Sequence, residues 1–330
     1  MPDIPPHPST PRDGWTPLKT AHCSAAVSPL GAILHDLTFT LPDGRKFAPL
    51  AEAEWSGRAR PEDSPDLSPH LAELGGEWPC VPFGTSPADP QHHGFCSNAA
   101  WRLDAADGGS ARLSIDYPAG HDIAQVARSI RLSPDSPSVT FGLEITAARD
   151  CCLPLGLHPI FRLPEGGAGV MLDWTGGQQA TTLPKALAPL TLTPVPGAQI
   201  TKGGPVACLD GTEFRFPAEF PRQREALVQI WDCEGEVALR YAEEAAGVRL
   251  TWAPEDLPHC LLWLANPGGE IPGLGQFTGL GVEPVSSLFD RGIAPFDDSV
   301  ADRAAGVALR AGEIWRTQYE ISAFPLSPSV

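Results

Sequence analysis

The sequence has no apolar run near the length of about 20 residues that a membrane-crossing helix needs, and no stripe of basic residues. Asp and Glu number 40 against 23 Lys and Arg, so the formal net charge is −17. Such a surface repels phosphate backbones and anionic lipids, and we expect neither nucleic acid nor a membrane as a partner. The segment Met1 to Trp15 lacks a charged start and an apolar stretch, so no secretory signal is expected and the cytoplasm is the expected location.

Several spacings that carry chemistry elsewhere are also missing. None of the eight cysteines forms a C-x-x-C pair, which excludes a zinc knuckle or a dense disulfide framework and predicts reduced, mostly buried thiols. The chain has no H-x-H or H-E-x-x-H, which argues against a metal-dependent hydrolase, and no G-x-S-x-G, which argues against a serine hydrolase. We expect no metal and no cofactor.

Sustained helical periodicity and internal repeats are absent as well. The chain instead holds 37 Pro and 33 Gly, which indicates many turns and few long helices, while 42% hydrophobic residues suffice for a large core. We therefore predict an all-β chain, a large antiparallel β-sandwich formed as one domain over residues 16–330, preceded by a flexible Pro-rich tail over residues 1–15.

Alternating apolar and polar residues mark the strands. Residues 111–117 and 139–145 each alternate over one full strand with one wet face. Pro42-Asp43-Gly44 is a turn signal, so residues 37–40 and 46–48 are expected to form a hairpin. Further strands are predicted at residues 237–241, 248–252, 260–264 and 315–321.

Three separated segments place an imidazole or a carboxylate beside Gly or Pro. They are residues 90–95 with His92 and His93, residues 156–161 with His158, and residues 281–286 with Glu283. Loops of that kind often present reactive side chains. A carboxylate and an imidazole work as base and acid near neutral pH, so the set indicates proton-transfer chemistry on a neutral polar substrate.

The same segments carry a resemblance. The stretch from Leu74 to Gly84, LGGEWPCVPFG, together with His93-Gly94-Phe95, resembles the GG-x-P-x-x-P-x-x-G and HGF elements of the aldose 1-epimerase (galactose mutarotase) family. His158-Pro159-Ile160-Phe161 resembles its H-P-[YF]-F element, Val282-Glu283-Pro284 its late E-P element, and residues 309–313 its closing L-x-P-G-E. The spellings are closest to the branch that contains hexose-6-phosphate mutarotases.

The resemblance implies a β-sandwich with an open sugar-binding cleft that interconverts α and β anomers without a cofactor. By motif, Glu283 is the base and His158 the acid, and His93 orients the sugar. Trp78, Phe95 and Phe161 are the expected packing partners of the pyranose. Asp210 or Asp232 would be the aspartate that grips sugar hydroxyls. The phosphate-binding arginine that the family places after HGF is absent here, and Arg162 or Arg58 would replace it.

Other interpretations stay open. His93 could shape a turn, His158 could be a hydrogen-bonded core histidine, and Glu283 could cap a loop through backbone N–H groups. A non-catalytic carbohydrate-binding protein on the same fold would keep the aromatic residues but would not need His158 and Glu283 to converge. A sugar 6-phosphate remains an alternative substrate, and the chain is expected to be a monomer or a homodimer.

Overall fold

The computed structural model describes residues 14–57, 67–86, 89–164, 169–186, 193–222, 224–266, 270–271, 275–289 and 306–327. Residues 1–13 of the expected tail lie outside this part of the chain. Within it, strands dominate and helices are short, which confirms the all-β prediction. None of the described helices is long and apolar enough to cross a membrane.

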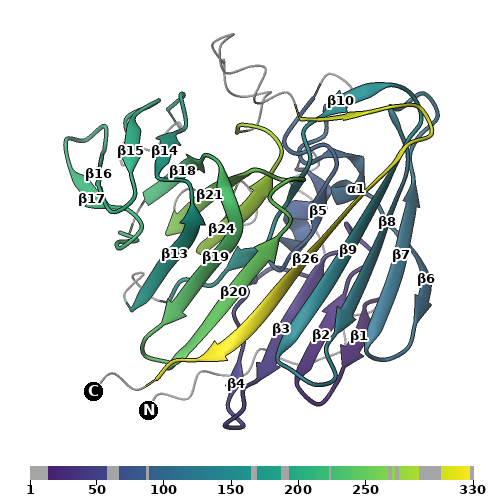
Figure 1. The fold of residues 1–330 in the computed structure, drawn as a ribbon, viewed down its shortest axis with the longest axis horizontal. Helices are drawn as coiled ribbons and strands as arrows, with labels where there is room; N and C mark the ends of the chain where they lie inside the picture. The colour runs from purple at the N-terminus through teal and green to yellow at the C-terminus, as the bar shows by residue number, and fades with distance from the viewer. Residues whose placement is uncertain are drawn as a thin grey trace.

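Two eight-stranded antiparallel sheets form the body of the protein (Figure 1). The first sheet has the order β13 (Val170–Gly176), β19 (Cys233–Tyr241), β20 (Ala246–Trp252), β26 (Ile314–Pro325), β9 (Ser138–Ala147), β8 (Ile123–Leu132), β7 (Ser110–Asp116) and β6 (Arg102–Ala106). The second has the order β15 (Gln199–Thr201), β14 (Gln179–Thr182), β18 (Arg224–Ile230), β21 (His259–Asn266), β24 (Gly279–Val285), β11 (Gly156–Leu157) and β5 (Pro79–Cys80), with β12 (Ile160–Phe161) also paired to β24.

Smaller elements complete the described part. The N-terminal sheet contains β1 (Thr16–Lys19), β2 (Cys23–Val27), β3 (Leu34–Thr40) and β4 (Lys46–Phe47). Three two-stranded sheets pair β10 (Cys151–Leu153) with β25 (Val307–Leu309), β16 (Pro205–Ala207) with β17 (Glu213–Arg215), and β22 (Glu270–Ile271) with β23 (Gly275–Gln276). The helices are the 3-10 helix η1 (Pro69–Glu73) and α1 (Gly94–Asn98).

The strand predictions are confirmed. Each predicted strand matches an observed one, although residues 48 and 117 lie one position beyond the ends of β4 and β7. The predicted hairpin is the β3–β4 pair, with Phe39 opposite Phe47. The burial of β9 alternates as its sequence does, with Phe141 and Leu143 inside. All eight cysteines are free, and six of them are buried, as expected for reduced thiols.

The second sheet is covered on both faces. Val228, Leu262 and Val282 point into the large core shared with the first sheet. Leu261 and Val285 point the other way, into a second cluster of buried side chains. Because both faces of β21 and β24 are covered, these strands are nearly continuous apolar runs. The candidate site lies on the face that belongs to the second cluster.

A buried ion pair joins the first sheet to the segment before β5. The guanidinium of Arg128, on β8, contacts the carboxylate of Glu77 and donates to the carbonyl oxygen of Ala32 at 2.5 Å. The hydroxyl of Tyr319 donates to the other oxygen of Glu77 at 2.6 Å. Burial raises the pKa of Glu77, while Arg128 and Tyr319 act in the opposite direction. The pair holds the backbone immediately before Trp78.

Candidate active site

Strand register brings the two predicted catalytic residues together. The strands β11 and β12 flank His158, and both pair antiparallel with β24. The register pairs are Gly156 with Val285 and Ile160 with Gly281. His158 therefore lies directly across from Glu283, and its Nε2 is 3.5 Å from Oε1 of the carboxylate. The pairing of three short segments creates a juxtaposition that the sequence could only suggest.

Trp78 extends the same row on the far side of His158. The backbone N–H of His158 donates to the carbonyl oxygen of Trp78 at 2.8 Å. The two rings stack with centroids 4.1 Å apart and an interplanar angle of 11°. Trp78 is fully buried. It thus fixes the plane of the imidazole and leaves no ring face for a sugar, which corrects its expected role.

His93 reaches the pair from the loop before α1. Its backbone is left-handed with φ 62°, and its N–H donates to the carbonyl oxygen of Gly84 at 2.7 Å. A side chain on Gly94 would have Cβ 2.2 Å from the carbonyl oxygen of Val81, so only glycine allows this approach. The ring of His93 meets that of His158 edge to face at 4.9 Å. This close backbone approach explains why glycine follows His93 in the sequence.

Burial controls the charge of the site. His158 and Glu283 are 5% and 2% exposed. Burial raises the pKa of Glu283 well above its usual range and lowers the pKa of His158 well below its own. Burial likewise lowers the pKa of His93, and the neighbouring histidines lower it further. The carboxyl of Glu283 and the imidazole of His158 therefore both favour their neutral forms, and the pair shares one titratable proton.

Several buried polar atoms of this face lack a partner within the described residues. Those without a hydrogen-bond partner include Nδ1 of His158, Oε1 of Glu283 and Nε1 of Trp78. Nε2 of Gln229 is another, on the strand β18 that lies beyond β21 in the same row. Buried polar groups are normally hydrogen-bonded, so such a cluster marks a place where a polar ligand supplies the missing bonds.

Trp263 and Glu225 also lie at this site, although the sequence analysis did not identify them as candidates. Trp263 is half-buried on β21 opposite Gly281, and its ring lies edge-on to His158 at 6.2 Å. Its Nε1–H donates to the carboxylate of Glu225 at 3.0 Å. Burial raises the pKa of that carboxyl. Trp263 therefore places a half-buried indole beside the His158–Glu283 pair.

The other predicted aromatic contacts pack with the large core cluster. Phe161 is fully buried in it, because the residues of β12 alternate and its side chain points away from the site face. Phe95 is half-buried against the same cluster and packs edge to face on Tyr117 at 5.2 Å. Both side chains contribute to the packing of the fold.

The predicted charged contacts are also engaged elsewhere. Asp210 is exposed in a turn, where its carboxylate accepts from the N–H and the hydroxyl of Thr212. Asp232 is exposed and has a left-handed backbone with φ 52°, and its N–H donates to Nδ1 of His259. Arg162 makes a bidentate pair with Glu244 at 2.8 and 2.9 Å, and Arg58 lies outside the described residues. None of these contacts involves His158 or Glu283.

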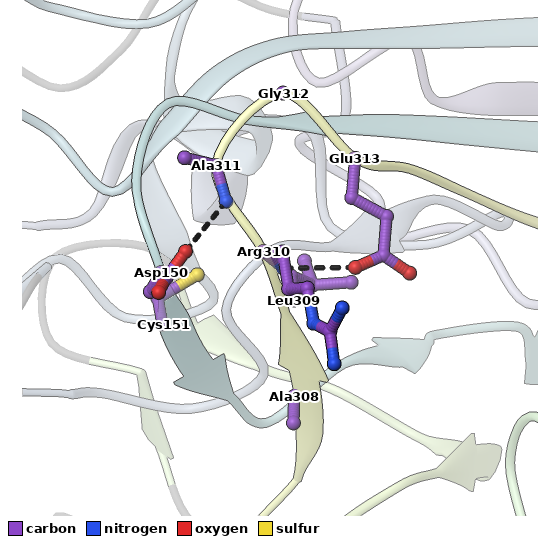
Figure 2. Close-up of a pocket in the computed structure, with 8 residues that line it drawn as sticks. All are labelled: Asp150, Cys151, Ala308, Leu309, Arg310, Ala311, Gly312 and Glu313. Carbon is purple, nitrogen blue, oxygen red and sulfur yellow. Dashed lines mark hydrogen bonds between the residues drawn. The ribbon is translucent and has the colours of Figure 1, made fainter.

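A surface pocket lies at the β10–β25 pair (Figure 2). It is lined by Asp150, Cys151 and residues 308–313, and contains no predicted site residue. Asp150 accepts from the N–H of Ala311 and Glu313 from that of Arg310, each at 2.8 Å. These bonds fix the turn of the closing L-x-P-G-E-like element, which therefore has a structural explanation.

The architecture is that of the galactose mutarotase-like β-sandwich. The GalM/aldose epimerase homologue from C. elegans superposes with a TM-score of 0.65 at 13% identity, covering 95% of this chain and 99% of that one. The galactose mutarotase related enzyme from Lactobacillus acidophilus gives 0.62 at 12%, covering 96% and 99%. A galactose mutarotase-like protein from Lactobacillus casei gives 0.58 at 15%, covering 94% and 100%. No protein-family model and no curated protein matches the sequence.

Proposed function

We propose that this protein is an aldose 1-epimerase that interconverts the α and β anomers of a hexose. The observation that carries the proposal is the opposition of His158 and Glu283 at 3.5 Å on the face where buried polar atoms lack partners. The fold shared with galactose mutarotase-like structures supports it.

The reaction needs an acid and a base that lie close together. A base takes the proton from the C1 hydroxyl while an acid protonates the ring oxygen, and the C1–O5 bond breaks with its electron pair going to O5. The aldehyde then turns about the C1–C2 bond, and the reverse transfers close the ring on its other face. The C1 hydroxyl oxygen and the ring oxygen O5 are both bonded to C1 and so lie close together. An acid and a base in near contact can therefore reach both oxygens at once.

We assign Glu283 as the base and His158 as the acid. The single proton that the pair holds must then reside on His158 when the sugar is bound. Hydroxyl groups of the sugar that donate to Glu283 favour its ionised form and so move the proton in this direction. His93 and Trp263 are the proposed positioning contacts, and Glu225 is the carboxylate closest to the indole.

An unphosphorylated hexose is the substrate class that the site supports best. Arg162, the expected phosphate ligand, is neutralised by its bidentate pair with Glu244 and stacks over Tyr241 with its guanidinium carbon 5.3 Å from the ring centre. Recruiting it to a phosphate would break a charge-assisted pair. We therefore expect faster turnover of free sugars than of their 6-phosphates.

Polarimetry tests the proposal. Freshly dissolved α-anomers of glucose, galactose and their 6-phosphates are followed with wild type, Glu283→Gln and His158→Asn, with Glu236→Gln and His22→Asn as controls outside the site. Wild type should accelerate mutarotation of at least one free hexose, and each site variant should lose about 10²–10⁴-fold. A wild type that accelerates none of the sugars, or site variants as fast as wild type, would refute the assignment and favour a binding role.

A further inference from the structure

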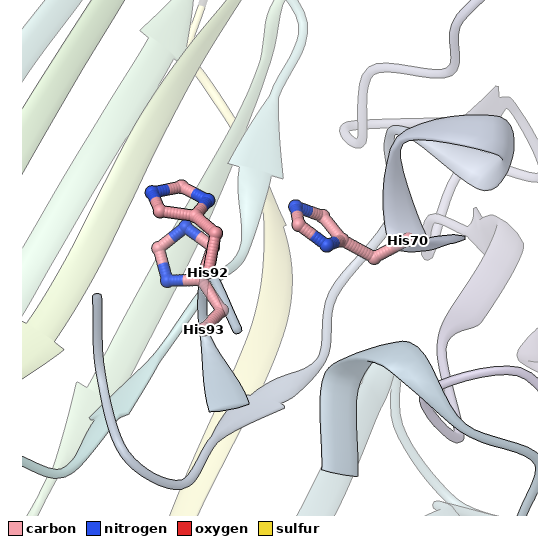
Figure 3. Close-up of side chains that lie close together, drawn as sticks. All are labelled: His70, His92 and His93. Atoms are coloured by element: carbon pink, nitrogen blue, oxygen red, sulfur yellow. The ribbon is translucent and has the colours of Figure 1, made fainter. Parts of the chain in front are cut away.

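Three histidines gather beside the acid–base pair. His70 comes from η1, while His92 and His93 come from the loop before α1. Each ring offers one nitrogen, and these three nitrogens all lie within 4.8 Å of one another. Figure 3 shows His70 facing the His92–His93 pair from the opposite side. His70 and His93 are buried, and His92 is half-buried.

The amide of Asn98 organises the cluster. Its Nδ2 donates to the carbonyl oxygens of His92 and Gly94, both at 2.8 Å, so the orientation of the amide is determined. Its Oδ1 must then accept from Nδ1 of His70, at 2.8 Å. His70 therefore carries its hydrogen on Nδ1 and keeps a lone pair on Nε2. Histidines that bind metals commonly have this arrangement, with one ring nitrogen held by an oxygen and the other bare.

We propose that His70, His92 and His93 bind a divalent transition-metal ion such as Zn²⁺, with the fourth position left to solvent. Three imidazoles plus an open position are an ordinary zinc ligand set, and imidazole also suits nickel and copper. Anomer exchange itself needs no ion, but the metal site would share His93 with the proposed sugar contacts. The proposal departs from the expectation of no metal. That expectation rested on local motifs, and the separation of His70 from His92 in the sequence matches no metal-binding motif.

Binding requires small movements of the rings. Zinc–nitrogen bonds of about 2.0–2.1 Å place tetrahedral ligand atoms about 3.4 Å apart, so nitrogens that lie within 4.8 Å must close in by roughly an ångström. His93 also accepts from the N–H of Gly84 through Nδ1 at 3.3 Å, which places its proton on Nε2. An ion at Nε2 would move that proton to Nδ1 and displace this long hydrogen bond.

Cobalt(II) titration tests the site. Untagged protein is stripped with a chelator and titrated with Co²⁺, whose visible absorption is intense in four-coordinate sites, and Zn²⁺ is then added as a competitor. Wild type should bind one equivalent with such a spectrum, which Zn²⁺ should abolish. Affinity should fall at least tenfold in His92→Ala and in His70→Gln, and about 10–100-fold in Asn98→Ala. His22→Ala, outside the cluster, should bind as wild type does.

His92→Ala is the decisive variant, because the half-buried ring can be removed with little risk to the fold. Circular dichroism of each variant checks the fold, and if His70→Gln is unfolded then His92→Ala still decides. Wild type that shows no saturable binding at one equivalent, or His92→Ala that binds as tightly as wild type, would overturn the proposal.

Discussion

Gly281→Ala tests the placement of the proposed base without removing it. Gly281 lies on β24 beside Glu283, and its backbone is outside the left-handed region, so alanine is allowed there. A methyl group at this position would lie 2.3 Å from Oε1 of Glu283 and 3.1 Å from Cβ of Trp263. The carboxylate must therefore move.

The size of the effect follows from that contact. Ordinary van der Waals separation begins near 3.4 Å, so Oε1 has to shift by about 1 Å. A misplacement of about 1 Å costs roughly 10²-fold in rate, equivalent to about 2.7 kcal/mol of activation free energy. Crowding should also lower the free energy of unfolding by about 1–3 kcal/mol.

Gly279→Ala is the matched control. It lies two residues away on the same face of β24, and its Cβ would meet Ile160 at 2.8 Å and Phe277 at 2.9 Å. Polarimetry and urea denaturation of both variants should show similar losses of stability but a large loss of rate only in Gly281→Ala. Equal rates in the two folded variants would show that the position of the carboxylate does not limit the reaction.

Three further outcomes are expected. Arg128→Met leaves Glu77 buried without its partner and should cost about 3–5 kcal/mol in urea denaturation, whereas a loss below 1 kcal/mol would mean that the pair is not desolvated. Burial lowers the pKa of His35, but the carboxylates around it, with that of Glu52 at 2.6 Å, outweigh burial and raise this pKa to about 9. The stability that this pair contributes is complete below the unfolded pKa of about 6.5 and is lost as pH rises through 9, so His35→Gln should flatten this decline in thermal melts, and parallel curves would contradict the linkage. Trp263→Leu should raise KM with kcat nearly unchanged, and an unchanged KM would remove the indole from the sugar site.

The sequence predicted eight of the strands in the described residues and the two central residues of the candidate site. Strands with one solvent-facing side, such as residues 139–145, are recognisable because apolar and polar residues alternate along them. His158 and Glu283 were found because each lies in a recognisable motif. Their contact depends on how β11, β12 and β24 pair, and pairing between distant segments leaves no local signal.

Sequence analysis missed Trp263, Glu225 and His70 for related physical reasons. Trp263 lies in a strand covered on both faces, where apolar residues run together and no pattern shows which side chain lines a site. Glu225 is identified only by its bond to that indole. His70 belongs to a short 3-10 helix and reaches His92 only through tertiary packing. Asp210 was chosen for its residue type, which serves a turn equally well.

The alignment of His158 with Glu283 is a property of the sheet and not of a loop. Successive residues of a strand point to opposite faces, so one residue inserted into β24 ahead of Glu283 would turn its carboxylate into the hydrophobic interior of the sandwich. Changes in the length of connections between strands leave that alignment intact. The surroundings of the candidate site can therefore diverge widely while His158 and Glu283 stay aligned.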